Sequence, residues 1–410
     1  PGTSCFEAFP VTPRRRPPAY PEQGVGAGDA TGTMLVMDVY QGLPDVPRGT
    51  VKYIRIVEEV PKPVAAECTG PRLQYPVVSA MSHLAVKRLL GTVPVEEDGS
   101  ACFRVPADVP VYFAALDENM MEVQRMRAFT QVRAGERTAC IGCHEARITA
   151  PANAVPLAAR REPSTIEPPP DGVHAPDFAY DVQPVLDRHC QRCHSGADPA
   201  GKLDLSDTRT NLFNVAYENL VTRGYVAYVD ANSSATLPLR PAKYYGSHAS
   251  KLVQTLLTTH RERVRLSKAD FERLVTWVDC NAPYYGTYVY GRKGTLGGRE
   301  LLTGAVRAAL QPVYDRRCAS CHGGDVAAVT RVDFRRVDRS PMLLAPLARD
   351  AGGTERCGQA VFPRDDDPDA LAWAEGMRIL ASEVASNPRE DMLPERPPIS
   401  DPLCRYVYRP

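Results

Sequence analysis

Cysteine and histidine recur together in three short segments of this 410-residue chain. Each segment reads Cys-x-x-Cys-His: Cys140 to His144 is CIGCH, Cys190 to His194 is CQRCH, and Cys318 to His322 is CASCH. Two thiols at this spacing can each add to a vinyl group of one porphyrin, and the histidine that follows can then present its imidazole to the iron. The pattern therefore predicts three covalently attached c-type haems.

The pentads assign nine residues to these cofactors. The expected thioether bonds come from Cys140, Cys143, Cys190, Cys193, Cys318 and Cys321. The expected proximal iron ligands are His144, His194 and His322. Zinc is the alternative, because paired cysteines also build tetrahedral metal sites. Zinc would need two further ligands for each pair and would not require a histidine directly after the second cysteine, so the pattern favours haem.

The other six of the twelve cysteines lack this spacing; they are Cys5, Cys68, Cys102, Cys280, Cys357 and Cys404. Covalent haem attachment takes place outside the cytoplasm, in an oxidising setting where cysteines can pair as disulfides. We therefore expect a periplasmic or extracellular protein whose export signal is not in this chain. A Cys357–Cys404 pair is one candidate disulfide.

The second face of each haem needs a distal ligand, which small cytochromes c commonly take from late in the domain. Met392, in the MLP segment, lies 70 residues after His322, and His260 lies 66 residues after His194. The spacing predicts that His322 pairs with Met392 on one iron and that His194 pairs with His260 on another. Thioether ligation raises the reduction potential relative to bis-histidine ligation, so these two haems are expected to differ.

Two further histidines are distal candidates. His248, in YGSHASKL, competes with His260, because it precedes an apolar helix that could cover a porphyrin. His83, in AMSHLAVKRLL, is the candidate for the first haem, with a structural role as its alternative.

The region around the second pentad is repeated around the third. Gln183 to Gly196 reads QPVLDRHCQRCHSG and Gln311 to Gly324 reads QPVYDRRCASCHGG, with nine of fourteen positions identical at an offset of 128. Such self-similarity indicates one structural unit used twice. We expect two mainly α-helical, cytochrome c-like modules at residues 173–296 and 297–410.

The chain before the repeat is rich in strand patterns. TVKYIRIVEEV and VPVYFAALDE are typical of strands, and the Asp-Gly of EEDGS, Glu96 to Ser100, predicts a hairpin-type turn. Residues 1–159 are expected to form an antiparallel β-sandwich-like domain that ends in the first pentad. The proline-rich segment 160–172 would be an extended, semi-rigid linker. The chain is thus predicted to be an α+β multidomain protein.

SKADFERLVTWVDCNAP carries the clearest helix pattern. Ser267 and Asp270 fit a capping pair, and Pro283 is expected to end the helix. One apolar stripe is expected to face the core: Phe271, Leu274, Val275 and Val278. The tyrosine-rich PYYGTYVYG that follows is expected to pack between modules, with a hydroxyl in contact with water.

Longer phrases carry a family resemblance. DVYQGL, PRGTVKYIRI, GTVPVEEDGSACF, LDENMMEVQRMR and CIGCHE, between about residues 30 and 145, resemble the middle domain of the hydrazine synthase alpha subunit. QPVLDRHCQRCH and LVTWVDCNAPYYGTY are similar to the haem domain that follows in that family, which extends the resemblance to about residue 290. The resemblance implies membership of a multihaem c-type cytochrome family.

The sequence also departs from the family pattern. In that family, a tyrosine four residues after the histidine of the middle-domain pentad binds iron, while the histidine turns to zinc. The matching position after His144 is Ile148, which cannot ligate iron, so this arrangement is not carried over. The third pentad also exceeds the two-haem pattern of that subunit.

These features predict an electron carrier that passes electrons between redox partners, such as other cytochromes, within a larger complex or a self-associated extracellular filament. The alternative is a haem redox enzyme acting on a small nitrogen compound or peroxide at the haem of Cys140, Cys143 and His144. A formal net charge of zero argues against a nucleic-acid partner. No stretch approaches the roughly 18 apolar residues of a transmembrane segment.

Overall fold

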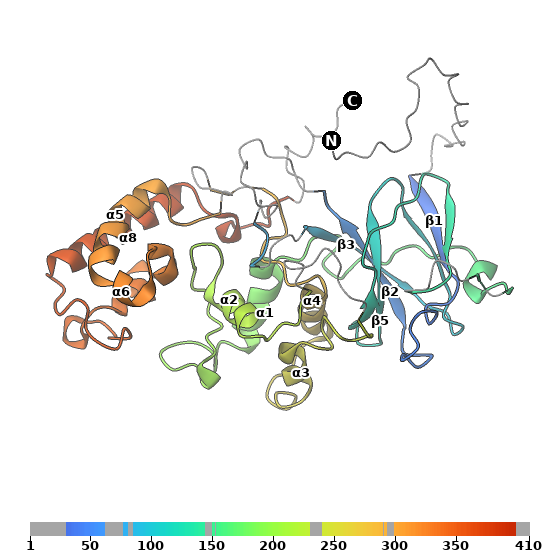
Figure 1. The fold of residues 1–410 in the computed structure, drawn as a ribbon, viewed down its shortest axis with the longest axis horizontal. Coiled ribbons are helices and arrows are strands. Elements are labelled where there is room, and N and C mark those ends of the chain that lie inside the picture. The colour runs from blue at the N-terminus through green and yellow to red at the C-terminus, as the bar shows by residue number, and fades with distance from the viewer. Residues whose placement is uncertain are drawn as a thin grey trace, which may run out of the picture.

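A computed structural model of the chain describes residues 30–61, 77–80, 85–143, 150–151, 153–229, 240–289, 291–292 and 299–398. Strands come first along the chain and helices later, which confirms the predicted α+β class. In Figure 1 the strands gather at one end of the molecule, the helices of residues 183–279 lie in the middle, and those of residues 304–386 lie at the other end. The order of the parts along the chain therefore follows the long axis of the molecule.

The described strands form two sheets. The three-stranded sheet has the order β4–β1–β7, made of β4 (Ala101–Pro106), β1 (Thr31–Val36) and β7 (Arg137–Cys140). The four-stranded sheet has the order β3–β2–β5–β6, made of β3 (Lys87–Pro94), β2 (Tyr53–Glu59), β5 (Val111–Leu116) and β6 (Glu122–Arg125). The β1–β7 pair is parallel and the other described ladders are antiparallel. The predicted wholly antiparallel sandwich is therefore wrong at β7, which enters the sheet from the same end as β1.

The two sheets pack face to face through alternating apolar side chains. Met34 on β1 and Ile56 on β2 are fully buried in the same core cluster. The rings of Phe103 on β4 and Phe113 on β5 meet edge to face, with centroids 5.2 Å apart. This contact joins a strand of one sheet to a strand of the other, so the core lies between the sheets.

The predicted turn at Glu96 to Ser100 is present, but it does not close a hairpin. The Glu96 amide donates to the Ser100 carbonyl at 2.8 Å, and Gly99 adopts a left-handed conformation with φ of +85°. The flanking strands β3 and β4 belong to different sheets. The turn itself was therefore predicted correctly. The pairing of β3 with β4 was not, because each strand joins the sheet in which its apolar face is buried.

The proline-rich segment is extended and lies along the β domain. Ser164 exchanges backbone hydrogen bonds with Cys102 and Arg104 of β4 at 2.8 and 3.0 Å. Glu167 exchanges two with Thr92 of β3, at 2.8 and 2.9 Å. The segment thus covers one strand of each sheet before the chain enters the helical region.

Two groups of helices follow. The short helix η1 (Leu157–Arg160) belongs to the β domain, where the Ala158 amide donates to the Ser100 hydroxyl at 3.0 Å. The group around the second pentad contains η2 (Phe178–Val182), α1 (Gln183–His189), η3 (Ala200–Lys202), α2 (Val215–Thr222), α3 (Lys251–Leu257) and α4 (Lys268–Asp279). The group around the third pentad contains α5 (Gly304–Arg317), α6 (Ala319–His322), η4 (Val326–Val329), η5 (Val337–Arg339), α7 (Pro341–Leu344), η6 (Arg349–Ala351), α8 (Pro368–Ser386) and η7 (Glu390–Met392). None of the helices in the described part of the chain has both the length and the apolar character needed to cross a membrane.

Helix α4 forms where the sequence predicts it. The Ser267 side chain accepts a hydrogen bond from the Asp270 amide at 3.0 Å, which caps the first turn. The predicted stripe faces the core, with Leu274, Val275 and Val278 at most 1% exposed. The helix ends at Asp279, before the proline expected to end it, because Asn281 and Ala282 take left-handed conformations (φ of 71° and 50°).

The second helical group is held by the packing of α5 against α8. A Cβ at Gly376 of α8 would lie 2.4 Å from the Leu310 side chain of α5, so only glycine allows this close approach. Trp373 of α8 is buried and donates from its indole to the Met342 carbonyl at 2.8 Å. The helix that leads into the third pentad is thus fixed by a long partner helix.

The tyrosine-rich segment packs between the parts of the molecule, as expected. Tyr284, Tyr285 and Tyr288 have no exposed surface. The Tyr284 hydroxyl donates to Asp391 at 2.6 Å, and the Tyr288 hydroxyl donates to the Val60 carbonyl at 3.2 Å. The expected contact of a hydroxyl with water is wrong for these three, because protein acceptors satisfy them inside the junction.

Candidate functional site

The second and third pentads adopt the same backbone conformation. In each, the amide of the first cysteine donates to the carbonyl four residues earlier at 2.8 Å, and the histidine amide donates to the carbonyl of the first cysteine at 3.0 Å. The dihedral angles of Cys190 (φ −120°, ψ −37°) and Cys318 (φ −123°, ψ −30°) also agree. Each pentad is therefore a tight turn that continues directly from a helix, α1 or α5.

The repeat also preserves a side-chain hydrogen bond. Gln183 Nε2 donates to Asp187 Oδ1 at 2.7 Å, and Gln311 Nε2 donates to Asp315 Oδ1 at 2.7 Å. Both bonds join positions four residues apart on the helix that leads into the pentad, where side chains share one face. The second and third sites are thus two copies of one local structure.

The structure brings His260 close to the second pentad. The imidazole centroids of His194 and His260 lie 6.2 Å apart, and their ring planes differ by 28°. His260 follows the end of α3, where its amide donates to the Thr255 carbonyl at 2.9 Å. A residue 66 positions along the chain is therefore returned to the pentad histidine, and the pairing of the two on one iron stays a prediction.

One nitrogen of each of these rings is already engaged. His194 Nδ1 lies 3.3 Å from the Leu203 carbonyl, and His260 Nδ1 lies 3.2 Å from the Thr259 hydroxyl. A metal-binding histidine typically uses its second nitrogen in this way, which fixes the ring and leaves Nε2 for the metal. Burial and the nearby His194 lower the pKa of His260, which favours the neutral imidazole that metals bind.

The first cysteine of each of these two pentads is held as a thiol. Burial raises the pKa of Cys190 to about 11, and it raises that of Cys318 to about 11. Cys193 and Cys321 are exposed and show no disulfide to another described cysteine. In the described ranges, no group of three or more histidine, cysteine, aspartate or glutamate side chains could hold a metal ion.

His248 lies elsewhere. Its Nε2 is 3.0 Å from Asp117 Oδ2, at the end of β5 in the β domain, and its carbonyl accepts a hydrogen bond from Gln254. Asp117 also accepts from the amides of Asn119 and Met121 at 2.9 and 3.0 Å. His248 therefore has a partner that ties the first helical group to the β domain.

Met392 shares a core with the third pentad. It is partly buried at the end of η7 and packs against the cluster that also contacts Cys318 and Ala319. His322 is exposed at the end of α6. The structure therefore places Met392 and the first cysteine of the pentad in one cluster, and the pairing of Met392 with His322 on iron stays a prediction.

The charged residues before Met392 are buried, which the sequence did not suggest. Arg389, Glu390 and Asp391 are 0%, 1% and 5% exposed. Arg389 and Asp391 pair at 2.7 Å, while Glu390 pairs with Arg299 at 2.5 Å. The available signal was one basic residue followed by two acidic residues, because buried charges must be paired.

The first pentad lies at the edge of the β domain. Cys140 ends β7, an outer strand of its sheet, and Cys140 and Cys143 pack against the sandwich core. A Cβ at Gly142 would lie 2.4 Å from the Gln41 side chain and 2.7 Å from the Asp38 carbonyl, so the pentad is pressed against the loop after β1. The proximal candidate His144 and the distal candidate His83 lie outside the described residues.

Three of the six remaining cysteines lie in the described part of the chain. Cys102 and Cys280 are buried and Cys357 is exposed, and none of them forms a disulfide with another described cysteine. The other three, Cys5, Cys68 and Cys404, lie outside it. The candidate Cys357–Cys404 pair therefore stays a prediction.

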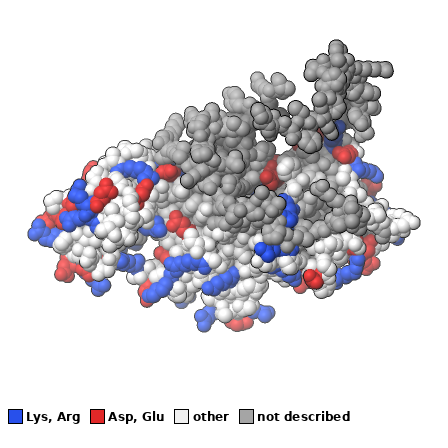
Figure 2. Space-filling model, viewed as in Figure 1, with Lys and Arg blue, Asp and Glu red and all other residues white. Residues whose placement is uncertain are grey.

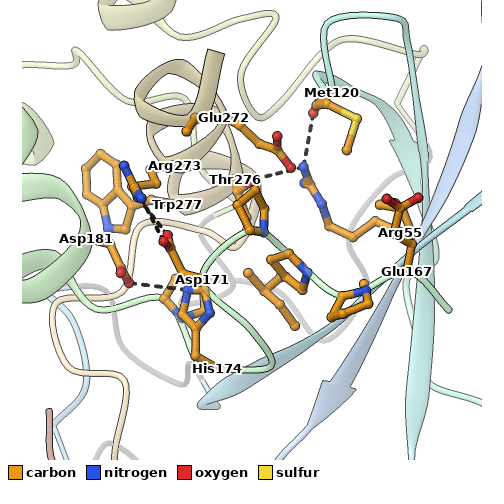
Figure 3. Close-up of a pocket in the computed structure, with 18 of the residues that line it drawn as sticks. Arg55, Met120, Glu167, Asp171, His174, Asp181, Glu272, Arg273, Thr276 and Trp277 are labelled. Atoms are coloured by element: carbon orange, nitrogen blue, oxygen red, sulfur yellow. Dashed lines mark hydrogen bonds and ion pairs between the residues drawn. The ribbon is translucent and has the colours of Figure 1, made fainter. Parts of the chain in front are cut away.

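A cavity of about 500 Å³ lies between the β domain, the proline-rich segment and α4 (Figure 3). Its walls include Arg55 of β2, Pro168 to Asp171, His174, and the face of α4 opposite its core stripe. Arg55 is buried and donates to the Met120 carbonyl at 3.0 Å and to Thr276 at 2.9 Å. None of the pentad residues lines this cavity.

Charged side chains connect the second pentad to this cavity. Asp270 at the start of α4 lies 3.3 Å from His189, the residue before the pentad, and 2.8 Å from Arg273. Arg273 in turn makes two bonds of 2.7 Å to Asp171 in the cavity wall. This chain of ion pairs orients α4 against the pentad helix.

Comparison with known proteins gives one family match. Residues 49–145 match the family model described as the hydrazine synthase alpha subunit middle domain. Among solved structures, Kuenenia stuttgartiensis hydrazine synthase is similar, with a TM-score of 0.45, 19% sequence identity, and coverage of 62% of this chain and 43% of that chain. The search of curated proteins gave no match.

The matched segment runs from just before β2 to the residue after the first pentad. It therefore contains the four-stranded sheet, most of the three-stranded sheet and the strand that carries the first pentad. The predicted resemblance is confirmed for these residues, and its extension to about residue 290 stays a prediction. Over residues 49–145, this chain is similar to the middle domain of the hydrazine synthase alpha subunit.

Proposed function

We propose that this chain is an exported trihaem c-type cytochrome that transfers electrons between redox partners. The observation that carries the proposal is the approach of His260 to His194, with ring centroids 6.2 Å apart. Two imidazoles that share one metal, each through a bond of about 2 Å, would have centroids about 6 Å apart. The separation of the pentad histidine and the remote histidine would therefore allow both to bind one iron.

Three further observations support haem at the repeated sites. The Nδ1 atom of His194 has a carbonyl partner at 3.3 Å, which leaves Nε2 for iron. The third pentad reproduces the backbone of the second, so the same attachment geometry is available there. The buried Tyr314 hydroxyl beside the third pentad lacks a hydrogen-bond partner among the described residues, as expected of a group that faces a bound cofactor.

Different residues of the repeat would bind different parts of each haem. Cys190 and Cys193, or Cys318 and Cys321, would anchor the porphyrin, and His194 or His322 would hold the iron from one side. His260 and Met392 would close the second faces. The haem iron supplies one-electron redox chemistry, and a thioether ligand at one site with an imidazole at the other would set different potentials.

Contacts between the two helical groups keep these sites in a fixed relation. Arg209 and Val332 exchange backbone hydrogen bonds of 2.8 and 2.9 Å. Arg356 donates to the carbonyls of Gly196 and Ala197, directly after the second pentad, the first of these at 3.3 Å. These contacts would hold the second and third haem sites at a defined separation, which would support electron exchange between them.

The proposed partners are other redox proteins or cytochromes, with self-association as a further possibility to be tested by sedimentation. Figure 2 shows lysine and arginine interspersed with aspartate and glutamate over the described parts of one face. Such a mixed surface, with a net charge of zero, lacks the concentrated positive field of a nucleic-acid binder. The proposed location is the periplasm or the extracellular space, where c-type haem is attached.

The second candidate function is a haem redox enzyme centred on the first pentad. The family that matches residues 49–145 is named for a synthase, and the match includes Cys140 and Cys143. The first pentad also follows a strand and not a helix, so its haem would sit in surroundings unlike those of the other two. An open iron coordination position at this haem, binding a small nitrogen compound or peroxide, would distinguish this function from electron transfer.

The test is spectroscopy of the purified protein and two ligand variants. Mass analysis of the denatured chain should show three covalent haems, and electron paramagnetic resonance should show low-spin iron at the second and third sites. His260→Ala should convert one low-spin haem to high-spin iron. Met392→Ala should remove a methionine-to-iron charge-transfer band and leave the His260-dependent signal unchanged.

His248→Ala is the matched control, because His248 has Asp117 as its partner and should leave all three haem signals unchanged. Absence of covalent haem would overturn the whole proposal. High-spin iron that binds carbon monoxide in the unaltered protein, assigned to the first haem by Cys140→Ala with Cys143→Ala, would favour the enzyme over the carrier.

A further inference from the structure

Tyr314 lies on α5 four residues before Cys318, the first cysteine of the third pentad. Positions four residues apart on a helix share a face, so the tyrosine ring and the cysteine lie on the same side of α5. Tyr314 belongs to the apolar cluster against which Cys318 and Met392 pack. The ring is therefore part of the wall that the third haem would touch.

The Tyr314 hydroxyl is buried without a partner. Tyr314 has no exposed surface, and among the described residues no group accepts or donates a hydrogen bond at its hydroxyl. Burying such a group unpaired costs about 1–3 kcal/mol, so proteins almost always provide a partner. Burial and the nearby Cys318 raise the pKa of Tyr314, so at neutral pH its hydroxyl is protonated and can donate.

The matching position in the first copy of the repeat shows what packing alone requires. Leu186, four residues before Cys190, is fully buried, and its cluster contacts Cys190. An aliphatic side chain thus fills this position next to the second pentad without any polar atom. The hydroxyl of Tyr314 is an addition that the fold of the repeat does not need.

We infer that Tyr314 is a positioning residue that donates a hydrogen bond into the third haem site and raises the reduction potential of that haem. This inference rests on the proposed attachment of haem to the third pentad. The acceptor is an electron-rich atom that the occupied site provides, either a porphyrin carboxylate or the Met392 sulfur. A donor to either atom stabilises the reduced iron, because reduction adds one electron and increases the negative charge on the acceptor.

The experiment compares the reduction potentials of the three haems in the unaltered protein and in Tyr314→Phe, which removes only the hydroxyl. We expect the equilibrium of the third haem to shift about three- to tenfold toward the oxidised form, where tenfold corresponds to 59 mV for one electron. The other two potentials should stay the same. A change in the methionine-to-iron band would identify the sulfur as acceptor, and a changed pH dependence of the potential would identify the carboxylate.

Tyr217→Phe is the matched control. Tyr217 is also fully buried, but its hydroxyl donates to the Ala282 carbonyl and accepts from the Ala80 amide, each at 3.0 Å. This variant should lower stability without moving the third potential. If Tyr314→Phe carries three haems with unchanged potentials, the inference is wrong. If mass analysis finds no haem on the third pentad, the proposed function fails first.

Discussion

One hydrogen bond on each imidazole decides which ring nitrogen of His194 and of His260 is left to bind a metal. His194 and His260 each engage Nδ1 locally, so the nitrogen that remains on each ring is the one that can reach a metal. His248 instead lies with Nε2 3.0 Å from Asp117 Oδ2, so the nitrogen that a distal ligand would need faces a carboxylate of the β domain. At the residue scale, His260 is therefore better placed than His248, although both were candidates from the sequence.

Gly142 offers a test of the first pentad at the same scale. Because its missing side chain lets the pentad lie against Asp38 and Gln41, Gly142→Ala should force the pentad away from the loop after β1. We expect loss of covalent haem from the first pentad, with haem retained at the other two, as counted by mass analysis of tryptic peptides. Gly324→Ala, just after the third pentad, is the control, because no atom lies within 4 Å of its added Cβ. Full haem at all three pentads in Gly142→Ala would contradict the prediction.

Residue spacing was sufficient to predict the pentads and to relate His260 to His194, because both depend on positions along the chain. It was not sufficient for Arg389, Glu390 and Asp391, which are charged and yet buried. Burial of a charge depends on partners that arrive from distant segments, such as Arg299 and Arg209. Only the fold brings those partners together.

At the scale of elements, local signals predicted α4 and its cap, the Glu96 to Ser100 turn and the repeated pentad helices. Each of these depends on residues within about one turn of each other. The assignment of β3 and β4 to different sheets and the parallel β1–β7 pair were missed. Strand partners are chosen by which apolar faces meet in the sandwich, and that information is spread over the whole domain.

The short helix η7 gives a pH prediction at this scale. Burial raises the pKa of Glu390 to about 7, against the opposing charge of Arg299, and Asp391 adds to the increase while Arg389 opposes it. A carboxyl whose pKa is higher in the folded state stabilises the fold at low pH, and this contribution is lost as the pH rises from about 4.5 to about 7. Glu390→Gln should remove that pH dependence. Over this pH range, the unfolding free energy of the variant should therefore fall less than that of the unaltered protein, with a difference of up to about 3 kcal/mol.

Denaturant unfolding at several pH values measures this difference. Asp391→Asn is the matched control with the opposite sign: although burial opposes it, the charges of Arg389 and Arg209 lower the pKa of Asp391. Its stabilising effect is therefore present above its ordinary pKa and is lost as the pH falls, so the variant should lose most stability at neutral pH. Parallel pH profiles for Glu390→Gln and the unaltered protein would contradict the assignment.

At the scale of the whole molecule, the two helical groups are joined by buried charges and not by a continuous apolar core. Arg389 is fully buried and donates to the carbonyls of Thr210, Asn211 and Phe213 at 2.7 to 2.9 Å. Its partner Asp391 also accepts from the Tyr284 hydroxyl at 2.6 Å. One loop before Met392 thus binds the tyrosine-rich segment and the loop before α2, which places the proposed distal ligand at the junction.

This arrangement predicts that Arg389 couples the unfolding of the two groups. Arg389→Ala would remove a donor from the carbonyls of Thr210, Asn211 and Phe213, of which the last two keep a backbone donor, and would remove the nearest cation from Asp391. Breaking a buried pair in this way costs about 3–5 kcal/mol of stability, and this loss weakens the junction between the two helical groups. Calorimetry should therefore show a separate, earlier transition for residues 299–398, whereas the unaltered protein should unfold those residues together with the first group.

Arg378→Ala is the matched control, because Arg378 lies on the same part of the chain, its side chain is 66% exposed, and its one ion pair among the described residues is with Glu375. Exposed pairs contribute about 0–1 kcal/mol, so this variant should keep the single transition. Because the same loop ends in Met392, Arg389→Ala should also weaken the methionine-to-iron band of the third haem before the transition begins. The prediction would be contradicted if both variants unfolded in a single transition and kept the methionine-to-iron band. The buried charges would then not be what couples the second helical group to the first.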